Sequence, residues 1–459
     1  MPKITLEEIL NEREYIYNTH SKLLSQYQNT LVSFNLNIPG TLKNSKIISE
    51  NFFYGCELIE KELEKNSIKI IHSHVHLSNA GNTAFYIADE NPIKIKKLLI
   101  LLEEIKPIGR LFDIDIIEKN GNKISRSDIG YSKRKCFICD KEAFICSRNQ
   151  YHPKEVISSK VEEILITNYI KIAVKKALLT ELQLSPKPGL VDKIDSGSHS
   201  DMDYNTFISS IEAIVPHFSI IIDTAFHWKD ALNNLFPKIR EIGIEAEKAM
   251  FLATNNVNTH KGAIFLLGIL CAISSYSFRY KKSFIIEDIL FMTKEMTYQG
   301  LTEDFIQIKN KKSHTNGEKI YLKYGYKGIR EEVLSGFSII KECILPLLQK
   351  RLEENFNSHQ ILSEILITLF SKVNDTNVIN RSNIETLLFA QEEASYLIKS
   401  KKLLNEDYIS ILEKMNENFI KKNISHGGCA DLLSVTLFLW FLEISDENSN
   451  YSLSKFSLN

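Results

Sequence analysis

The sequence lacks both an excess of charge and a long apolar run. Its 56 Lys and Arg residues balance 57 Asp and Glu residues, which leaves a formal net charge of -1. A nucleic-acid-binding or membrane-docking protein is expected to carry a basic excess, so neither nucleic acid nor a membrane is predicted as a partner. The longest apolar runs, Ala263–Ile273 and Val435–Leu442, fall short of the roughly 20 residues that cross a bilayer and indicate buried helices.

Features of exported proteins are also missing. Residues 1–8 contain no apolar signal core, and the seven cysteines are an odd number scattered along the chain. Such a set of cysteines is typical of a reducing compartment. The sequence therefore predicts a cytoplasmic protein.

Proline is scarce in the second half, where Pro346 is the only one after Pro237, and no Gly/Ser/Pro-rich linker is present. Apolar residues recur at helical spacing from about Val161 onward, which predicts an all-α domain at residues 159–459. Residues 1–158 instead mix helices with strands. Because a chain of this length exceeds one core, we predict a multidomain protein: an α+β N-terminal domain with a small mixed sheet, followed by an all-α C-terminal domain.

Two stretches of the first half alternate as strands do. Residues 32–38 place apolar side chains on one face and polar ones on the other, which predicts a half-buried strand. Residues 68–77 are a second candidate and place His72, His74 and His76 on a single face. These histidines could bind a metal, but no carboxylate or cysteine joins them, so a solvated strand face is the favoured interpretation.

Every polar cluster of the second half lies at a helix end. The clusters are Pro186–Asp192 with Gly197–Asp203, Thr254–Gly262, Gly325–Glu332, Asp375–Asn377 and Gly427–Asp431. Any one of them alone would more often be a helix cap. Together they supply Lys, Arg, His and carboxylates, which favours a polyphosphate pocket with bound magnesium. The residues thus predict a helical enzyme that handles a nucleotide, without naming its reaction.

These motifs, in this order, resemble triphosphoribosyl-dephospho-CoA synthase over roughly residues 165–445. The resemblance implies that the ribose 2'-hydroxyl of 3'-dephospho-CoA is joined to the anomeric carbon of ATP, with loss of adenine, so that ATP is a substrate. The sequence departs from the family pattern at Asn255-Asn256, where two glycines are usual, at His426, which replaces a proline, and at Cys429, which replaces a serine.

This chemistry and the resemblance nominate site residues in the second half. Glycosyl displacement passes through an oxocarbenium-like state and needs a base for the hydroxyl, help for the leaving adenine and a held triphosphate. By hypothesis, Asp201 or Asp203 binds magnesium or acts as the base. His199 and His260 are candidates for proton transfer. The candidates for substrate binding are Lys187, Asp192, Asn258, Lys261, Arg330, Asp375, Asn377 and Asp431.

In the first half, Gly109–Ile117 is predicted to be a strand whose alternation places Asp113 and Asp115 on one face. Paired carboxylates of this kind can hold one or two magnesium ions for transfer of a nucleotidyl-type group. An isolated pair would more often be plain exposed surface. Here Arg110 before the pair and Ser125-Arg126 after it can bind phosphate, which favours the magnesium site.

The segment that follows contains the run Cys-x2-Cys-x6-Cys-x5-His, formed by Cys136, Cys139, Cys146 and His152. These residue types at this spacing could form a small zinc site. The alternative is a set of ordinary half-buried thiols in a reducing cytoplasm. The second interpretation is favoured, because the loops are tight, although the sequence does not exclude zinc.

Asn37–Gly40 with Lys43, and Arg134–His152, join the preceding motifs in a resemblance to holo-citrate-lyase synthase, the apo-citrate lyase phosphoribosyl-dephospho-CoA transferase, over roughly residues 5–155. The resemblance implies transfer of the triphosphoribosyl product to a serine of the acyl-carrier subunit of citrate lyase, with release of pyrophosphate. Asp113 and Asp115 would then be catalytic residues that hold magnesium. The phosphate-binding candidates are Arg110, Arg126, Arg134 and Arg148.

Both halves thus resemble successive steps of one pathway, which predicts a bifunctional transferase that makes and attaches the prosthetic group of citrate lyase. Fusion would keep the intermediate near its second site through a raised effective concentration. Two alternatives stay open: the same chemistry could serve the carrier subunit of a malonate decarboxylase, or the first half could be a non-catalytic module that docks the carrier.

Overall fold

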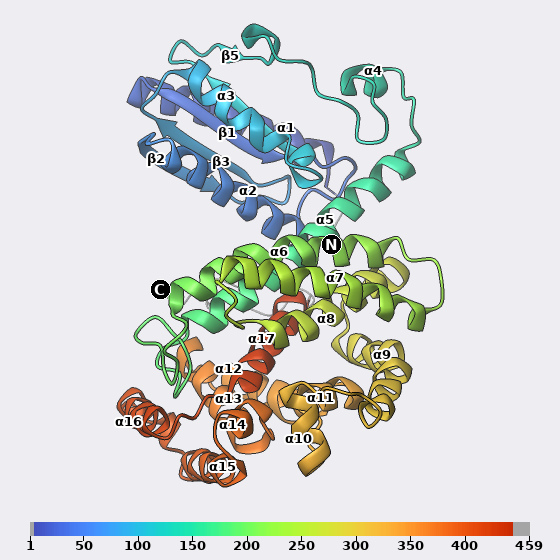
Figure 1. Cartoon of the computed structure of the whole chain (residues 1–459). Coiled ribbons are helices and arrows are strands. Elements are labelled where there is room, and N and C mark those ends of the chain that lie inside the picture. The colour runs from blue at the N-terminus through green and yellow to red at the C-terminus, as the bar shows by residue number, and fades with distance from the viewer. Residues whose placement is uncertain (1–3, 444–459) are drawn as a thin grey trace. The chain divides into compact units, whose positions relative to one another are not determined.

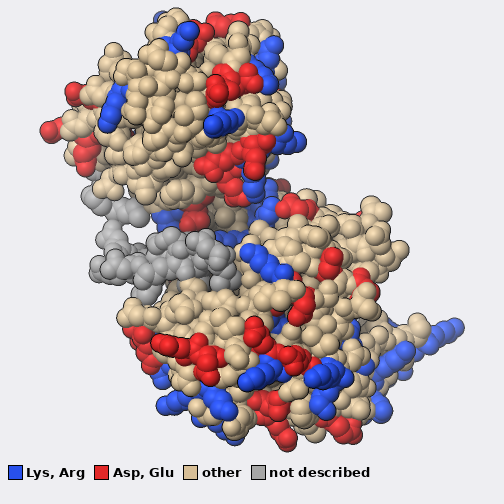
Figure 2. Space-filling view, turned by 90° about the vertical axis from the view of Figure 1, so that its left-hand side faces the viewer, with Lys and Arg blue, Asp and Glu red and all other residues tan. Residues whose placement is uncertain are grey.

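The computed structural model describes residues 4–443, and the chain forms two compact units that divide between Ile172 and Ala173 (Figure 1). The division falls within helix α5 (Lys154–Gln183), and the predicted boundary at residues 158/159 lies in the same helix. On the face shown in Figure 2, acidic and basic side chains are interspersed over both units, in keeping with the near-zero net charge.

The N-terminal unit is built on a five-stranded sheet with the order β2-β3-β1-β4-β5. Its strands are β1 (Thr30–Leu36), β2 (Ile70–His76), β3 (Thr83–Ala88), β4 (Phe112–Ile117) and β5 (Lys123–Ile124). Every neighbouring pair is antiparallel. The α+β class is confirmed, but the sheet is antiparallel and not mixed as predicted. Strands β3 and β4 run in the same direction, yet they are not hydrogen-bonded to each other, because β1 lies between them.

Helices cover both faces of this sheet. The covering helices are α1 (Leu6–Tyr27), α2 (Lys46–Lys65) and α3 (Pro92–Glu103). The unit also contains the short α4 (Ala143–Arg148) and the 3-10 turns η1 (Ile108–Leu111) and η2 (Ser127–Ile129). Ile59 of α2 and Leu99 of α3 enter the core on one face, and Leu24 of α1 enters a smaller core on the other. Because α1 covers that second face, β1 is not half-buried as predicted: Ser33 is buried too and lies 3.0 Å from His20.

The three histidines of β2 also face α1 instead of forming a freely solvated face. His72 stacks on Tyr27 and His76 stacks on Tyr15, with ring centroids 5.2 and 3.9 Å apart. Their role in this unit is therefore to pack an edge strand against a helix.

Helix α2 was not apparent from the sequence, because Gly55 interrupts its centre and glycine is a poor helix former. The glycine permits close packing, since a Cβ at this position would lie 2.3 Å from the ring of Phe34. The predicted strand Gly109–Ile117 begins only at Phe112, because residues 108–111 form the turn η1.

The C-terminal unit is all-α over its described residues, as predicted. Its long helices are α6 (Tyr204–Phe226), α7 (Leu232–Ala253), α8 (Lys261–Lys281), α9 (Ile286–Ile308), α13 (Ser358–Lys372), α15 (Ile384–Lys399), α16 (Tyr408–Lys421) and α17 (Gly427–Leu442). The shorter segments are α10 (Asn316–Tyr324), α11 (Ile329–Ser335), the π-helical η3 (Ile340–Ile344), α12 (Leu345–Glu353), α14 (Thr376–Arg381) and η4 (Lys402–Leu404).

Helices α8 and α17 form the centre of this unit, where they pack against each other (Figure 1). Both are apolar around most of their circumference, as expected of helices surrounded by protein. By length and composition α6 and α8 could cross a membrane, but 78% of the apolar window of α8 is buried inside the unit. The N-termini of α8 and α17 carry two of the polar motifs.

Apolar residues recur at helical spacing through residues 329–352, which favours one continuous helix, but the structure breaks this segment after α11. Gly336 and Phe337 take left-handed conformations, with φ of 73° and 58°, and the amide of Phe337 donates to the carbonyl of Glu332 at 2.6 Å. This pattern caps a helix C-terminus. The apolar periodicity resumes beyond the turn, which is why the break was not visible in the sequence.

Candidate active sites

In the N-terminal unit, Asp113 and Asp115 project from the same face of β4, opposite to the side chains that enter the larger core. Asp115 pairs with Lys123 at 2.5 Å, and Asp113 pairs with Arg134 at 3.3 Å. Burial, followed by the charge of Asp113, raises the pKa of Asp115 above its ordinary value. Two such neighbouring carboxylates would be stabilised by a divalent cation.

A buried glutamate behind this strand gathers the predicted arginines. Glu103 is 3% exposed and accepts hydrogen bonds from the guanidinium groups of Arg126 and Arg134. Arg110 instead donates to the backbone carbonyl groups of residues 135 and 136, at 3.0 Å for Cys136. A buried charge is destabilising unless it is paired. Arg126 and Arg134 therefore stay bound to Glu103, which fixes the positions of both guanidinium groups.

These three arginines and Glu103 line a cavity of about 660 Å³. A second hollow of about 210 Å³ is lined by Asp113, Lys43 and the start of α1. Asn37 lines both, so the two hollows adjoin at the Asn37–Gly40 motif. An elongated phosphorylated ligand could therefore reach from the arginines to Asp113.

Two residues of this unit differ from the sequence-based prediction of the site: one predicted residue does not line the cavity, and one residue that does was not predicted. Arg148 is exposed on α4 and is not among the residues that line the larger cavity. Glu103 was not predicted, because a glutamate at the end of an apolar helix resembles an ordinary solvated residue. The tertiary contact that buries it joins segments about 20 to 30 residues away, and no local pattern records that contact.

In the C-terminal unit, the Pro186–Asp192 loop is held by its own side chains. Lys187 is 2% exposed and pairs with the equally buried Glu181 of α5 at 2.5 Å. Asp192 accepts hydrogen bonds from the amides of Lys187 at 2.8 Å and of Ile194 at 2.6 Å. Asp192 therefore shapes the loop, and Lys187 brings a buried positive charge to its inner side.

The next predicted residues lie further along the same loop. The Nε2 atom of His199 is 2.8 Å from the hydroxyl of Ser425, and its Nδ1 atom is 3.3 Å from Arg381. Burial, with a smaller contribution from Arg381, lowers the pKa of His199 to about 4, so the ring is neutral. Asp201 lies 3.8 Å from this ring, with 60% of its side chain exposed.

Asp203 is the N-cap of α6. Its carboxylate accepts hydrogen bonds from the amide of Thr206 at 2.8 Å and from the hydroxyl at 2.7 Å, which lower the pKa of Asp203. The structure thus gives Asp203 a local capping contact, and it records no contact between Asp203 and the two carboxylates described next.

Two carboxylates lie where the N-termini of α8, α14 and α17 meet. Asp375 is buried and accepts hydrogen bonds from the amides of Asn377 at 2.9 Å and of Cys429 at 3.0 Å. Asp431 lies so close to Gly262 that a Cβ there would come within 1.9 Å of its carboxylate. Burial raises the pKa of Asp375, and burial together with neighbouring carboxylates raises the pKa of Asp431 well above its ordinary value.

A cavity of about 340 Å³ opens beside Asp375 and is lined by Gly328, Thr376, Gly428 and Glu332. An oxygen of Glu332 is buried there without a hydrogen-bond partner among the described residues. Burial raises the pKa of Glu332 to about 7. Glu332 was not selected from the sequence, because a glutamate in the first turn of a helix ordinarily serves the helix dipole.

The remaining predicted residues surround the start of α8. The Nδ1 atom of His260 is 2.7 Å from the hydroxyl of Ser210, and burial, then the charge of Lys187, lowers the pKa of His260 to about 3. Lys261 is half exposed and pairs with Glu247 at 2.7 Å. Arg330 lies over the ring of Phe305, with 6.0 Å from guanidinium carbon to ring centroid.

Arg330 and Glu247 both line a further cavity, of about 260 Å³. Because Ile329 lines the cavity beside Asp375, the two hollows lie on either side of the α11 N-terminus. Asn258 contributes locally, since its side-chain oxygen accepts a long 3.4 Å hydrogen bond from the amide of Lys261.

The structure accommodates the residues at all three places where the sequence departs from the family pattern. Asn255 and Asn256 have φ of 52° and 66°, and asparagine is among the residues that tolerate this left-handed region best after glycine. His426 is buried and stacks on Phe370 with centroids 4.3 Å apart. Cys429 is buried, and its amide, which any residue but proline would supply, is the group that binds Asp375.

Comparisons with known proteins cover the whole described chain. The family model for ATP:dephospho-CoA triphosphoribosyl transferase matches residues 167–450, and that for apo-citrate lyase phosphoribosyl-dephospho-CoA transferase matches residues 4–168. Protein CitXG of Haemophilus influenzae is 32% identical over 452 residues, which cover 95% of this chain and 96% of that protein.

Two further relatives agree with this division. Protein CitXG of Leuconostoc mesenteroides subsp. cremoris is 31% identical over 473 residues, which cover 95% of this chain and 97% of that protein. A probable 2-(5''-triphosphoribosyl)-3'-dephosphocoenzyme-A synthase of Streptococcus equi subsp. equi is 39% identical over 279 residues, which cover 58% of this chain and 94% of that protein.

The capping contact of Asp203 predicts how two substitutions differ. Asp203→Ala removes the acceptor for Thr206 and should lower the melting temperature by a few degrees. Asp203→Asn keeps an oxygen at the same position and should melt close to the wild type, because asparagine caps helices as well as aspartate does. Thermal unfolding followed by circular dichroism makes the comparison, and equal melting of all three proteins would contradict the capping role.

Proposed function

Because this chain belongs to the CitXG family, we propose that its two units catalyse successive reactions. The C-terminal unit makes 2'-(5''-triphosphoribosyl)-3'-dephospho-CoA and adenine from ATP and 3'-dephospho-CoA. The N-terminal unit then transfers the phosphoribosyl-dephospho-CoA group to a serine of the citrate lyase acyl-carrier subunit and releases pyrophosphate. The observation that carries this proposal is the pair of cavities, one lined by carboxylates at helix N-termini and one lined by arginines.

In the first reaction the 2'-hydroxyl oxygen of dephospho-CoA bonds to C1' of the ATP ribose while the bond from C1' to adenine breaks. The proton of the hydroxyl leaves with the adenine overall, and the triphosphate stays intact. The side chains of Lys261 and Arg330, which lie near the N-termini of α8 and α11, are suited to hold the triphosphate. Carboxylates near C1' would stabilise the positive charge that develops on the sugar.

Magnesium fits the carboxylates of this unit. Asp375, Asp431 and Glu181 offer oxygen ligands, and burial raises the pKa of each, so their negative charge is poorly balanced by protein alone. When bound there, magnesium would neutralise triphosphate oxygens. Asp201 and Asp203 stay candidates for the same role, as the sequence predicted, from the rim of the loop.

Glu332 is the base that we propose for the hydroxyl. It lines the cavity beside Asp375, one of its oxygens has no hydrogen-bond partner among the described residues, and its pKa is raised to about 7. A general base works best when its pKa lies near the working pH. The neutral rings of His199 and His260 are candidates for assisting the departing adenine.

The pH dependence of adenine release tests this assignment. The base must be ionised, so kcat/KM should rise with pH up to about 7 and level off above it. Glu332→Gln should lower the rate by about a hundredfold or more and remove this rise. Glu287→Gln, an exposed substitution in the first turn of α9, is the matched control. A Glu332→Gln enzyme with the wild-type rate and profile would exclude the role.

In the second reaction the serine oxygen of the carrier attacks the α-phosphorus of the triphosphoribosyl group. The bond to the β-phosphate breaks, and pyrophosphate leaves. Positioning and charge neutralisation supply most of the catalysis in such transfers. Arg110, Arg126 and Arg134 are the proposed phosphate ligands, supported by the cavity that they line, and Asp113 and Asp115 are the proposed magnesium ligands, supported by their proximity on β4.

Mass analysis of a purified apo-carrier tests the whole proposal. Incubation with this protein, ATP and dephospho-CoA should add one phosphoribosyl-dephospho-CoA group to the citrate lyase carrier. Asp113→Asn should slow this addition about a hundredfold or more while adenine release continues, because a metal ligand is lost in one unit only. Asp89→Asn, exposed just beyond β3, is the matched control.

Each alternative gives a different result in this assay. Addition of the phosphoribosyl-dephospho-CoA group to a malonate decarboxylase carrier alone would show that the citrate lyase carrier is not the acceptor. Undiminished transfer of purified intermediate by Asp113→Asn would contradict the magnesium role and favour a docking module.

A further inference from the structure

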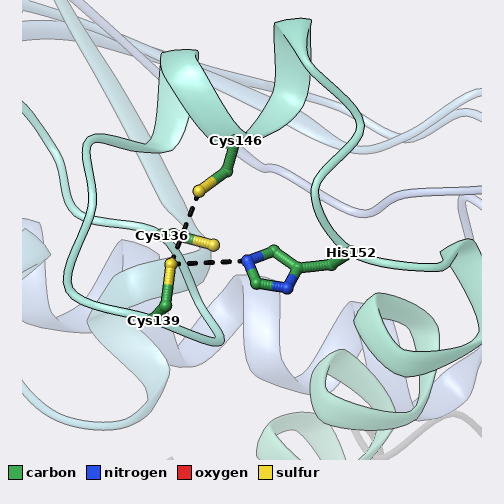
Figure 3. Close-up of side chains that lie close together, drawn as sticks. All are labelled: Cys136, Cys139, Cys146 and His152. Carbon is green, nitrogen blue, oxygen red and sulfur yellow. Dashed lines mark hydrogen bonds between the residues drawn. The ribbon is translucent and has the colours of Figure 1, made fainter.

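Four potential metal ligands converge in the N-terminal unit, beside the arginine-lined cavity. Figure 3 shows the side chains of Cys136, Cys139, Cys146 and His152 pointing toward one another. The Sγ atom of Cys139 lies 3.5 Å from that of Cys146 and 3.4 Å from Nε2 of His152. One ligand atom from each of the four lies within 4.8 Å of all the others, and all three cysteines are free thiols.

These distances match a tetrahedral zinc centre. Zinc–sulfur bonds of about 2.3 Å in a tetrahedron place two sulfur atoms about 3.8 Å apart. Three thiolates and one imidazole form a closed set of four ligands, which is typical of structural zinc and leaves no position for a substrate. A disulfide, by contrast, would join only two of the four groups.

The backbone is shaped to present these ligands. A bridge between Lys135 and Glu142 and a 2.8 Å hydrogen bond from the amide of Cys136 to the carbonyl of Lys141 close a tight hairpin around the first two cysteines. The amide of Ile138 points at Sγ of Cys136 from 3.4 Å, which suits a thiolate. Helix α4 supplies Cys146, and the chain beyond it returns His152.

Apart from the ion pairs of Arg126 and Arg134 with Glu103 and the packing of Phe137 and Ile157 on the larger core, little holds this segment in place. From residue 125 to residue 160, Cys146 is the only buried residue, and the segment contains only one six-residue helix and one 3-10 turn before α5. A segment that buries so little apolar surface needs a cross-link to keep one conformation. The four ligands are the only such group that the described part of this unit offers.

We propose that Cys136, Cys139, Cys146 and His152 bind a structural zinc ion. This ion would fix the arginine wall of the transfer site, which consists of Arg110, Arg126 and Arg134. The hairpin contains Arg134, which reaches Glu103 and Asp113, and its backbone carbonyl groups accept hydrogen bonds from Arg110. Zinc binding itself follows from the ligand geometry alone. Its effect on transfer rests on the proposed function of the N-terminal unit.

Metal analysis of the full-length protein, purified under reducing conditions without chelator, tests the binding. The wild type and the control Cys343→Ser, altered in the C-terminal unit, should each contain about one zinc per chain, and Cys139→Ser and Cys146→Ser should lose it. Cobalt substituted for zinc should give the thiolate charge-transfer absorption in the wild type. Wild-type protein that takes up no zinc on incubation with the metal would overturn the proposal, whether or not the variants fold.

The two reactions separate the role of zinc from the proposed function. The wild type is stripped of zinc with a zinc-selective chelator and then assayed in excess magnesium. Transfer to the carrier should be suppressed and should recover when zinc is added back, whereas adenine release should stay unchanged. Zinc loss with full transfer would overturn the positioning of the arginine wall. Stoichiometric zinc in a protein that never modifies the carrier would support the metal site and contradict only the proposed transfer.

Discussion

The structure depends on how buried charges are balanced, and the two units balance them in opposite ways. In the C-terminal unit, Glu181 is paired with Lys187, whereas Asp375 is held by backbone amides, and the half-buried Asp431 has no ion-pair partner among the described residues. Burial raises the pKa of both Asp375 and Asp431, and the neighbouring carboxylates add to the rise at Asp431. A site of this kind favours a cation, which the proposed magnesium-bound triphosphate would supply.

The N-terminal unit has the complementary arrangement. A single buried carboxylate, Glu103, gathers Arg126 and Arg134, so positive charge exceeds negative charge along the cavity. This positive charge is suited to bind the phosphates of the intermediate. The carboxylates of Asp113 and Asp115 lie next to it, and Asp113 pairs with Arg134. One unit is thus suited to build a triphosphoribosyl group around a metal ion, and the other to grip that group during its transfer.

The sequence was most informative where a signal is local. Alternation located β1 and β2, periodicity located the long helices, and the ordered motifs predicted both families and the bifunctional enzyme, which the comparisons confirm. It failed where a distant contact decides the local structure. Gly55 breaks the helical pattern of α2 because Phe34 occupies the space of a side chain, and α1 buries a strand face that is polar in sequence.

The candidate sites show the same limit. The helix-end motifs brought attention to Asp375 and Asp431, which the fold places together, but Glu181, Glu332 and Glu103 are recognisable only once their burial is known. Asp192 and Asp203 have the composition of ligands, yet their recorded hydrogen bonds go to groups within a few residues. A carboxylate that shapes its own loop and one that awaits a ligand look alike in a sequence.

The most direct test of this charge balance is ATP binding to the wild type and to Asp431→Asn, measured by calorimetry with magnesium and with a chelator. Removing an unbalanced carboxylate should not lower the melting temperature. The wild type should bind ATP only when magnesium is present, and Asp431→Asn should weaken that binding by about tenfold or more. Equal ATP binding with and without magnesium, unchanged by the substitution, would contradict the account.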